Sequence, residues 1–243
     1  MNIKARPLKL KIFFEDEDLI VLHKPKGLSM HPGAGNSEQT TLVHGLLAHS
    51  SSLSSPDSPY FRPGIVHRLD KDTEGIVVIA KNNEVHEFLS KQFSNRTIDR
   101  AYWALSYGKV PQYLEIDAPI GRHPKERKKM AVVRNGKPSQ TLVRLLQYFE
   151  EGYSWLECKL LSGRTHQIRV HLSYKGHAIL GDPVYASRRK LSSLANKKRE
   201  AFESLRGQAL VAFRLGFIHP RNQKKMLFEI ETPEWMRPLL KIL

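Results

Sequence analysis

The uninterrupted apolar run Ile76-Val77-Val78-Ile79-Ala80 constrains the fold of this chain more than any other feature. Its length and its β-branched residues are typical of a buried strand. Directly before it stands a polar turn, residues 63–75, which contains Arg68, Asp70 and two glycines. Loops on a firm scaffold carry most chemistry, so a carboxylate at the mouth of this strand is well placed to meet a substrate. Taken alone, the same residues fit an aspartate that only caps the turn and pairs with Arg68.

The rest of the chain predicts more strands than helices, joined by short connections. A helix is expected from an asparagine cap at residue 82 or 83 to about residue 95, and the strand pair 139–149 and 153–161 turns at Glu150-Glu151-Gly152. Other strands are predicted at 8–14, 19–23, 100–107, 209–218 and 225–230, with a short helix at 42–48 and a terminal helix after Thr232-Pro233. We therefore predict an α+β fold, a mixed and mainly antiparallel β-sheet with flanking helices, as a single domain over residues 1–243.

The charge balance points to a nucleic-acid partner. The chain carries a net charge of +15 and has a pI near 9.9. Residues 121–137 contribute +6 and residues 188–200 contribute +5 of this excess. A charge run is usually a solvated face, but two clustered runs in an otherwise nearly neutral chain are better explained as segments that contact phosphates.

Cysteine usage and hydropathy exclude several classes of protein. With Cys158 alone, the chain can form neither an intramolecular disulfide nor a cysteine-based zinc site. It has no long uncharged apolar run, and its first residues lack the apolar core of a signal peptide. These observations predict a cytoplasmic protein that does not enter a membrane.

A third distinctive stretch is Ser162-Gly163-Arg164-Thr165-His166-Gln167-Ile168-Arg169-Val170-His171-Leu172, followed by Gly181-Asp182-Pro183-Val184-Tyr185. Two arginines, two histidines and a glutamine within eight residues suggest a segment too polar for a core. They suit a charged site or an RNA groove, although an exposed polar helix start would have the same composition.

Taken together, these motifs resemble the RluA-type family of pseudouridine synthases along almost the whole chain. The similarity rests on Lys24-Pro25-Lys26-Gly27, His67-Arg68-Leu69-Asp70, Arg100-Ala101-Tyr102, residues 163–172 and residues 181–185, in that order. The segment from Pro119 to Pro124, with Gly136-Lys137-Pro138, is most similar to the ribosomal large-subunit, RluD-like branch. Because the pattern begins within about the first dozen residues, the S4-like module that precedes it in many relatives is expected to be absent.

The resemblance implies that the protein isomerises uridine in RNA to its C-glycoside without a cofactor or metal. It implies that Asp70 is the nucleophile or the carboxylate that promotes elimination, and attack on the sugar and on the base both remain open. It makes Arg169 the cationic partner of Asp70, and Tyr102 the ring that stacks on the extruded uracil. Arg68 is expected to fill the space that the flipped base leaves.

Further residues follow from the same resemblance and from charge. The predicted RNA contacts besides Arg68 are His67, Arg122, Lys125, Arg127, Lys128, Lys129, Arg164, His166 and Gln167. Ile168 and Leu210 are expected to line the pocket, and Lys24 to act as a scaffold residue or phosphate contact. The chain departs from the commoner pattern at Thr73-Glu74-Gly75 and at Gly207 to Ala212, which lacks an arginine and a histidine. These departures bear on substrate preference rather than on the chemistry.

Three other functions fit part of the sequence. A metal-dependent RNA hydrolase needs clustered ligands, and His67 with Asp70 and Asp72 is the sequence's only candidate group. A non-catalytic RNA-binding or ribosome-assembly protein would use the same basic surface but would not need Asp70, Tyr102 and Arg169. The same isomerisation on transfer RNA is also open, although ribosomal RNA is the favoured partner. Nothing in the sequence demands more than a monomer.

Overall fold

The computed structural model describes residues 3–33, 39–55, 62–126, 129–186, 200–202 and 205–243. The chain forms two compact units, each with its own internal contacts. The first unit comprises Met1–Asp99 and Arg214–Glu229, and the second comprises Arg100–Phe213 and Ile230–Leu243. The single domain expected from sequence therefore stays a prediction, and the two units are described separately.

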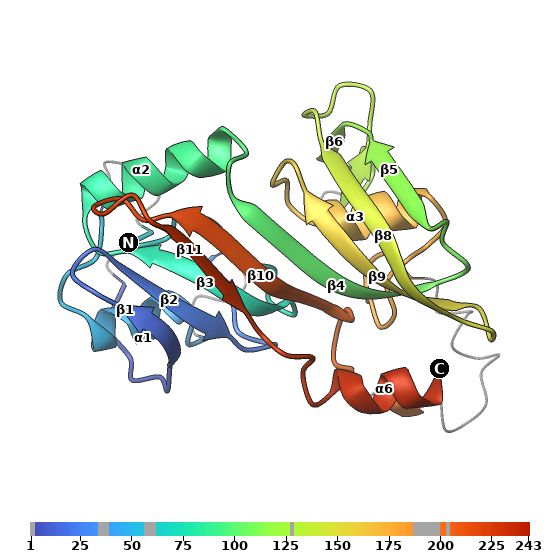
Figure 1. The fold of residues 1–243 in the computed structure, drawn as a ribbon, viewed down its shortest axis with the longest axis horizontal. Coiled ribbons are helices and arrows are strands. Elements are labelled where there is room, and N and C mark those ends of the chain that lie inside the picture. Colours follow the sequence, from blue (N-terminus) through green and yellow to red (C-terminus); the bar gives the residue numbers. More distant parts are fainter. Residues whose placement is uncertain (1–2, 34–38, 56–61, 127–128, 187–199, 203–204) are drawn as a thin grey trace. The chain divides into compact units, whose positions relative to one another are not determined.

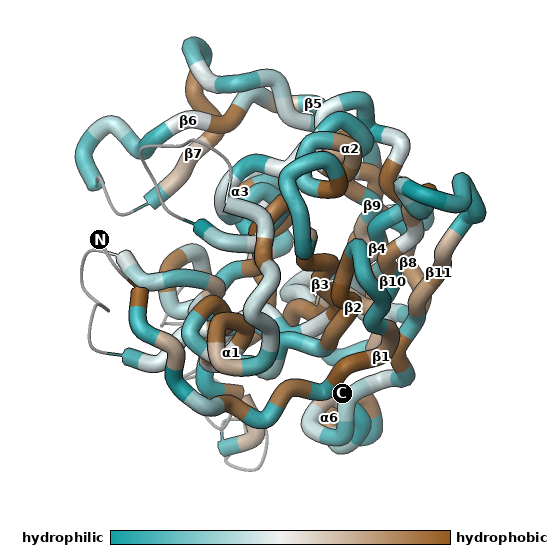
Figure 2. The backbone as a smooth tube through the Cα atoms, turned by 90° about the vertical axis from the view of Figure 1, so that its left-hand side faces the viewer, coloured by the Kyte–Doolittle hydropathy of each residue, from teal (hydrophilic) through white to brown (hydrophobic). Residues whose placement is uncertain are grey.

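The apolar run at residues 76–80 forms the buried strand of the first unit, as predicted. It belongs to β3 (Glu74–Ala80), which pairs antiparallel with β2 (Leu19–Lys24), and β2 pairs in turn with β1 (Lys11–Glu15). Figure 2 shows the hydrophobic stretches along β2 and β3, whose side chains are almost all buried. The unit also contains α1 (Leu42–His49), α2 (Asn83–Ser94), most of β10 (Leu210–Ile218) and β11 (Lys225–Glu229), its antiparallel partner.

The second unit is built on four antiparallel strands in the order β4, β9, β8, β5. Helix α3 (Gln167–Tyr174) packs against β8 and against a two-stranded hairpin, β6–β7 (Figure 1). The strands are β4 (Asp99–Tyr107), β5 (Tyr113–Asp117), β6 (Ile120–Arg122), β7 (Met130–Val132), β8 (Gln140–Phe149) and β9 (Tyr153–Leu160). A terminal helix, α6 (Met236–Ile242), follows the Thr232-Pro233 signal.

The predicted fold class is confirmed, and most elements begin and end within a few residues of their expected bounds. The sequence reading missed β5, the β6–β7 hairpin and α3. The two hairpin strands were missed because each has only three residues, too few to show the alternation expected of strands. Helix α3 was missed because polar side chains occupy several of its buried positions.

Asn82 caps helix α2, and its removal should weaken the first unit measurably. Its Oδ1 accepts the Val85 amide at 2.9 Å, and its amide group also reaches Asp18. We expect Asn82→Ala to lower the free energy of unfolding by about 1 kcal/mol in denaturant titrations. The matched control is Asn95→Ala at the exposed opposite end of α2. An equal loss in both variants would contradict the capping role.

Candidate active site

The turn that carries Asp70 is fixed to β3 by backbone geometry and by a half-buried histidine, His67. Gly64 adopts φ +75°, where a Cβ would stand 2.5 Å from the Ile79 side chain. His67 Nε2 accepts the Val78 amide at 3.0 Å, and its ring stacks on Phe93. Asp70 is half-buried at the end of this turn. The carboxylate is therefore held on a rigid support, as the sequence predicted, while His67 serves to build the turn.

Lys24 fastens the same turn from the other side. The side chain is fully buried, and its ammonium donates hydrogen bonds to the carbonyl oxygens of Pro25 (2.9 Å), Leu28 (2.8 Å) and Lys71 (3.0 Å). The Gly27 amide donates to the same Lys71 oxygen. Lys71 directly follows Asp70, so these bonds set the path of the chain at the carboxylate. This geometry assigns Lys24 the scaffold role rather than a phosphate contact.

Two lysines beside the turn have lowered pKa values. Burial lowers the pKa of Lys24 to about 8, while the negative charges of Asp72, Asp70 and Glu74 act in the opposite direction. Burial likewise lowers the pKa of Lys26 to about 8, against the attraction of Asp72 and Glu74. Below pH 8 both ammonium groups are charged.

In the second unit, Arg169 is buried and paired with Asp182. Its Nε and Nη2 donate to the two carboxylate oxygens of Asp182 at 2.7 and 2.9 Å, and only 4 % of the arginine is exposed. The guanidinium carbon also lies 5.1 Å from the ring centroid of Tyr185. Sequence reasoning quoted Asp182 and Tyr185 within a motif but assigned them no role. Their only indication in the sequence was that both belong to the motif at residues 181–185.

Tyr102 lies on β4, opposite Cys158 of β9, and is 7 % exposed. Arg100, two residues earlier, packs its guanidinium about 3.0 Å from the position where a Cβ of Gly163 would stand. Burial lowers the pKa of Arg100, and the interaction with Tyr102 raises it. Gly163 thus leaves room for the guanidinium of Arg100 of β4 beside the loop before α3. The two predicted pocket residues, Ile168 and Leu210, are both buried.

The polar stretch at the start of α3 is mostly internal, so the inference that it is too polar for a core is wrong. Gln167 accepts from Ser162 and the Arg164 amide, and donates to the Gln140 carbonyl and Thr141. Polar groups can be buried when each finds a partner. The ring of His171 is buried and has a partner at each nitrogen: Nδ1 bonds to the Thr141 hydroxyl and Nε2 bonds to the Ala118 carbonyl.

His166 begins the helix in a left-handed conformation and bonds through Nδ1 to the Tyr185 hydroxyl at 2.9 Å. Arg164 contacts the Pro138 carbonyl at 3.4 Å. The side-chain amide of Gln167 and Nε2 of His67 are engaged in internal hydrogen bonds, so these atoms are not available to RNA.

The basic segment 121–137 forms the β6–β7 hairpin and its flanks. Arg122 and Lys125 are exposed, and Lys129 pairs with Glu126 at 2.7 Å. Arg127 and Lys128 lie outside the described residues, as does most of the second basic segment, 188–200.

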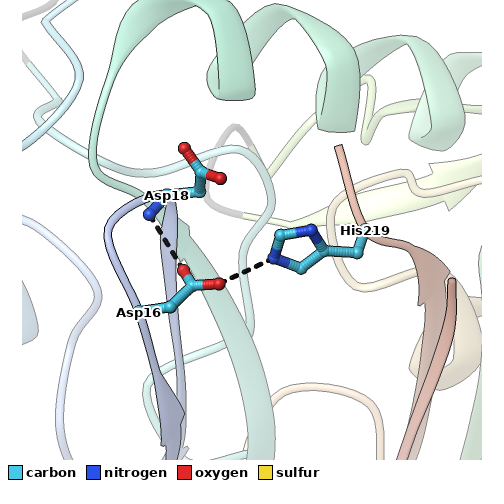
Figure 3. A group of neighbouring side chains, drawn as sticks. All are labelled: Asp16, Asp18 and His219. Atoms are coloured by element: carbon cyan, nitrogen blue, oxygen red, sulfur yellow. Dashed lines mark hydrogen bonds and ion pairs between the residues drawn. The ribbon is translucent and has the colours of Figure 1, made fainter. Parts of the chain in front are cut away.

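One group of side chains in the described part of the chain lies close enough to hold a metal ion: Asp16, Asp18 and His219 (Figure 3). His219 Nε2 donates to Asp16 Oδ2 at 2.8 Å, and Arg221 donates to both oxygens of Asp18 at 2.7 and 2.8 Å. The hydrogen bond from Arg221 is the main cause that lowers the pKa of Asp18. These bonds tie the β1–β2 turn to the β10–β11 turn. Sequence reasoning missed the group because about 200 residues separate its members.

Comparison with known proteins identifies the family. Residues 18–174 match the family model described as RNA pseudouridylate synthase. The chain belongs to the RNA pseudouridylate synthase family, and the resemblance to its RluA-type members is confirmed.

Two relatives illustrate the similarity. "Uncharacterized RNA pseudouridine synthase YlyB" of Bacillus subtilis is 42% identical, with 99% of this chain and 75% of the relative covered. "Ribosomal large subunit pseudouridine synthase D" of Nitrosomonas europaea is 46% identical, with 98% and 66% covered. This chain thus spans about two thirds to three quarters of the length of these relatives.

Solved structures confirm the fold. "Human RNA Pseudouridylate Synthase Domain Containing 4" has a TM-score of 0.72 at 23% identity, and covers 95% of this chain and 92% of its own. "Human RNA Pseudouridylate Synthase Domain Containing 1" has a TM-score of 0.71 at 24% identity, and covers 93% and 84%. No helix in the described residues has the length and apolar character needed to cross a membrane.

Lys24→Met should destabilise the first unit strongly. The Pro25 and Leu28 carbonyls lose a buried donor, and each loss costs about 1–3 kcal/mol, so we expect the free energy of unfolding to fall by about 2–6 kcal/mol. The matched control is Lys71→Met, which removes an exposed lysine from the same turn and should change stability by less than about 0.5 kcal/mol. A loss below 1 kcal/mol for Lys24→Met would refute the bracing role.

The two buried lysines also predict a pH dependence. In nitrogen NMR of lysine-labelled protein, we expect two ammonium groups to titrate near pH 8, well below the ordinary value of 10.5. The folded chain then releases protons that the unfolded chain keeps, so the free energy of unfolding rises with pH between about 8 and 10.5. Titration of all lysines above pH 10 would contradict the assignment.

Proposed function

We propose that this protein isomerises specific uridines to pseudouridine in ribosomal large-subunit RNA. Membership of the family supports the reaction, and the names of relatives such as the Nitrosomonas europaea protein support the RNA. The single observation that carries the proposal is Asp70, a carboxylate held on a braced turn in a strongly basic chain. Charge complementarity with the phosphate backbone supports RNA as the partner.

Asp70 supplies the carboxylate that the reaction needs. Breaking the glycosidic bond develops positive character on the sugar, and an ionised carboxylate stabilises that charge or forms a covalent bond to sugar or base. Its turn is held by the buried ammonium of Lys24, so the carboxylate is oriented before substrate binds. The uracil is then rejoined to the sugar through C5; the C5 proton is lost to solvent and N1 takes up a proton, which completes the isomerisation. Substrate and product have the same atoms, so the reaction itself requires no co-reactant.

Two side chains of the second unit act in the same reaction. We assign to Tyr102 the ring that stacks on the extruded uracil, which contributes about 1–3 kcal/mol of base binding. Arg169 supplies a guanidinium whose orientation is fixed by Asp182 and Tyr185. Pairing with Asp182 lets this cation remain buried before RNA binds.

The remaining proposed roles concern the RNA. The target base is stacked in structured RNA, so the enzyme must extrude it, at a cost of a few kcal/mol. Arg68 is exposed on the Asp70 turn and is suited to occupy the vacated space, because a guanidinium stacks on bases and binds phosphate. The segment 121–137 provides phosphate contacts. We propose that the protein acts as a monomer in the cytoplasm, where its single buried cysteine stays reduced.

Asp70→Asn should abolish isomerisation and leave RNA affinity within a few-fold of wild type. The change removes the charge that catalysis needs but leaves the basic surface intact. Tritium release from RNA labelled at uridine C5 measures turnover, and filter binding measures affinity. Asp72→Asn removes a neighbouring carboxylate from the same turn and should keep most of the turnover. Near-wild-type release by Asp70→Asn would refute the assignment, and would favour a role of the carboxylate in the fold alone.

Neutralising the hairpin segment should weaken RNA binding and flatten its dependence on salt. Each lost phosphate contact lowers the slope of log affinity against log salt by about 0.7–0.9. The variant replaces Lys125, Arg127, Lys128 and Lys129 with glutamine. The control replaces four exposed lysines elsewhere in the chain with glutamine: Lys91, Lys224, Lys225 and Lys241. Equal slopes for the two variants would show that the segment does not contact the RNA backbone.

A further inference from the structure

A groove in the second unit lies between the β6–β7 hairpin and helix α3. Its volume is about 340 Å³, near the lower end of the range of about 300–1,000 Å³ for small-ligand sites. Residues 129–132 and His123 line it from the hairpin, and Val170 and Tyr174 line it from the helix. Tyr185 completes the lining and accepts the Met130 amide at 2.9 Å, so the hairpin wall is attached to the rest of the unit. A groove of this size suits one nucleotide rather than a helix.

Tyr174 gives the groove an accessible aromatic surface. The residue is 57 % exposed, although its ring is large and mostly apolar. It lies one helical turn after Val170, on the same side of α3. The ammonium of its neighbour Lys175 stands 5.6 Å from the ring centroid. Proteins bind unpaired bases with this combination, an exposed aromatic ring beside a positive charge that contacts the phosphate.

The hairpin wall adds donors suited to an anion. His123 Nδ1 accepts the amides of Lys125 and Glu126 at 3.2 and 3.0 Å, so the ring proton resides on Nε2, which is then a donor. Lys129 also lines the groove and pairs with Glu126 at 2.7 Å. Glu126 contributes a negative charge to the same lining. A phosphate that enters the groove therefore competes with this carboxylate for Lys129.

We propose that the groove binds one unpaired nucleotide of the RNA substrate, distinct from the uridine that is isomerised. The base stacks on Tyr174, and Lys129 and His123 hold the adjoining phosphate. This inference rests on the proposed function, because it takes the occupant from the RNA that the enzyme modifies. Tyr185 connects the subsite with Arg169, since Tyr185 lines the groove and its ring lies against the guanidinium of Arg169.

Affinity for a transcript of large-subunit ribosomal RNA tests the stacking. We expect Tyr174→Ala to weaken binding about 5- to 150-fold, the range for loss of one stacked base, and Tyr174→Phe to stay within about twofold because it keeps the ring. Tyr113→Ala is the matched control, since Tyr113 on β5 is 73 % exposed and does not line the groove. Equal effects of Tyr174→Ala and Tyr113→Ala would overturn the proposal.

Glu126→Gln should strengthen RNA binding, whereas Tyr174→Ala should weaken it. Removing this carboxylate releases Lys129 for the phosphate, so RNA affinity should rise about two- to fivefold at low salt, and the gain should shrink as salt screens the charge. Weaker or unchanged binding by Glu126→Gln would contradict a phosphate at this place. Because the change improves binding, a damaged fold cannot mimic the expected result.

Photochemical cross-linking locates the nucleotide directly. The same transcript is made with 4-thiouridine, irradiated on the wild-type protein and digested with trypsin. We expect cross-links on the peptide Val170–Lys175, which contains Tyr174 and ends at trypsin sites on both sides. Cross-links confined to other peptides would overturn the subsite. The cross-linking is repeated with millimolar inorganic phosphate added. If phosphate abolishes the expected cross-link, the groove binds an anion rather than a stacked base, and this result also contradicts the proposal.

The two proposals fail in different ways. If wild-type protein releases no tritium from the transcript, the proposed reaction on this RNA is wrong, whatever Tyr174 does. If wild type is active and Tyr174→Ala binds as tightly as wild type, only the subsite is wrong.

Discussion

The site in the first unit depends on one buried cation. Lys24 sits at the end of β2 without contact to water, and its three protons are donated to three carbonyl oxygens. Burial of an ammonium is unfavourable unless all its donors are satisfied, so the loop 25–28 and the residue after Asp70 are held around it. The carboxylate thus stands on a turn whose path is set before any substrate arrives. Preorganised charges of this kind stabilise charge that develops in a transition state, which is the role we propose for Asp70.

The second unit also holds a buried cation in a fixed orientation, but here the partner of the cation is a carboxylate. Arg169 is buried, and Asp182 binds it through two parallel hydrogen bonds while Tyr185 packs beneath it. Asp182 also accepts the amides of Val184 and Tyr185, which fixes the carboxylate itself. Through its hydroxyl Tyr185 bonds to His166 and Met130. One tyrosine therefore connects the guanidinium, the start of α3 and the basic hairpin in one network of contacts.

The sequence predicted the parts of this structure that depend on local pattern. The strand at 76–80, the helix after Asn82 and the α+β class follow from periodicity and capping, and all three are observed. The buried polar helix could not be predicted in this way. Nothing local to Gln167 or His171 shows that Thr141 on β8 and the Ala118 carbonyl between β5 and β6 will satisfy them. The same limitation hid Asp182 as the partner of Arg169, and the bonds of His219 to a turn about 200 residues earlier.

The most direct test of the account is to map pseudouridine after reaction in vitro. Large-subunit ribosomal RNA and transfer RNA are transcribed without modification, incubated with wild-type or Asp70→Asn protein, and treated with a carbodiimide that marks pseudouridine for primer extension. The account predicts new stops at one or a few uridines of the ribosomal transcript, with wild type only. No new stop in that transcript, or the same stops with both proteins, would contradict it.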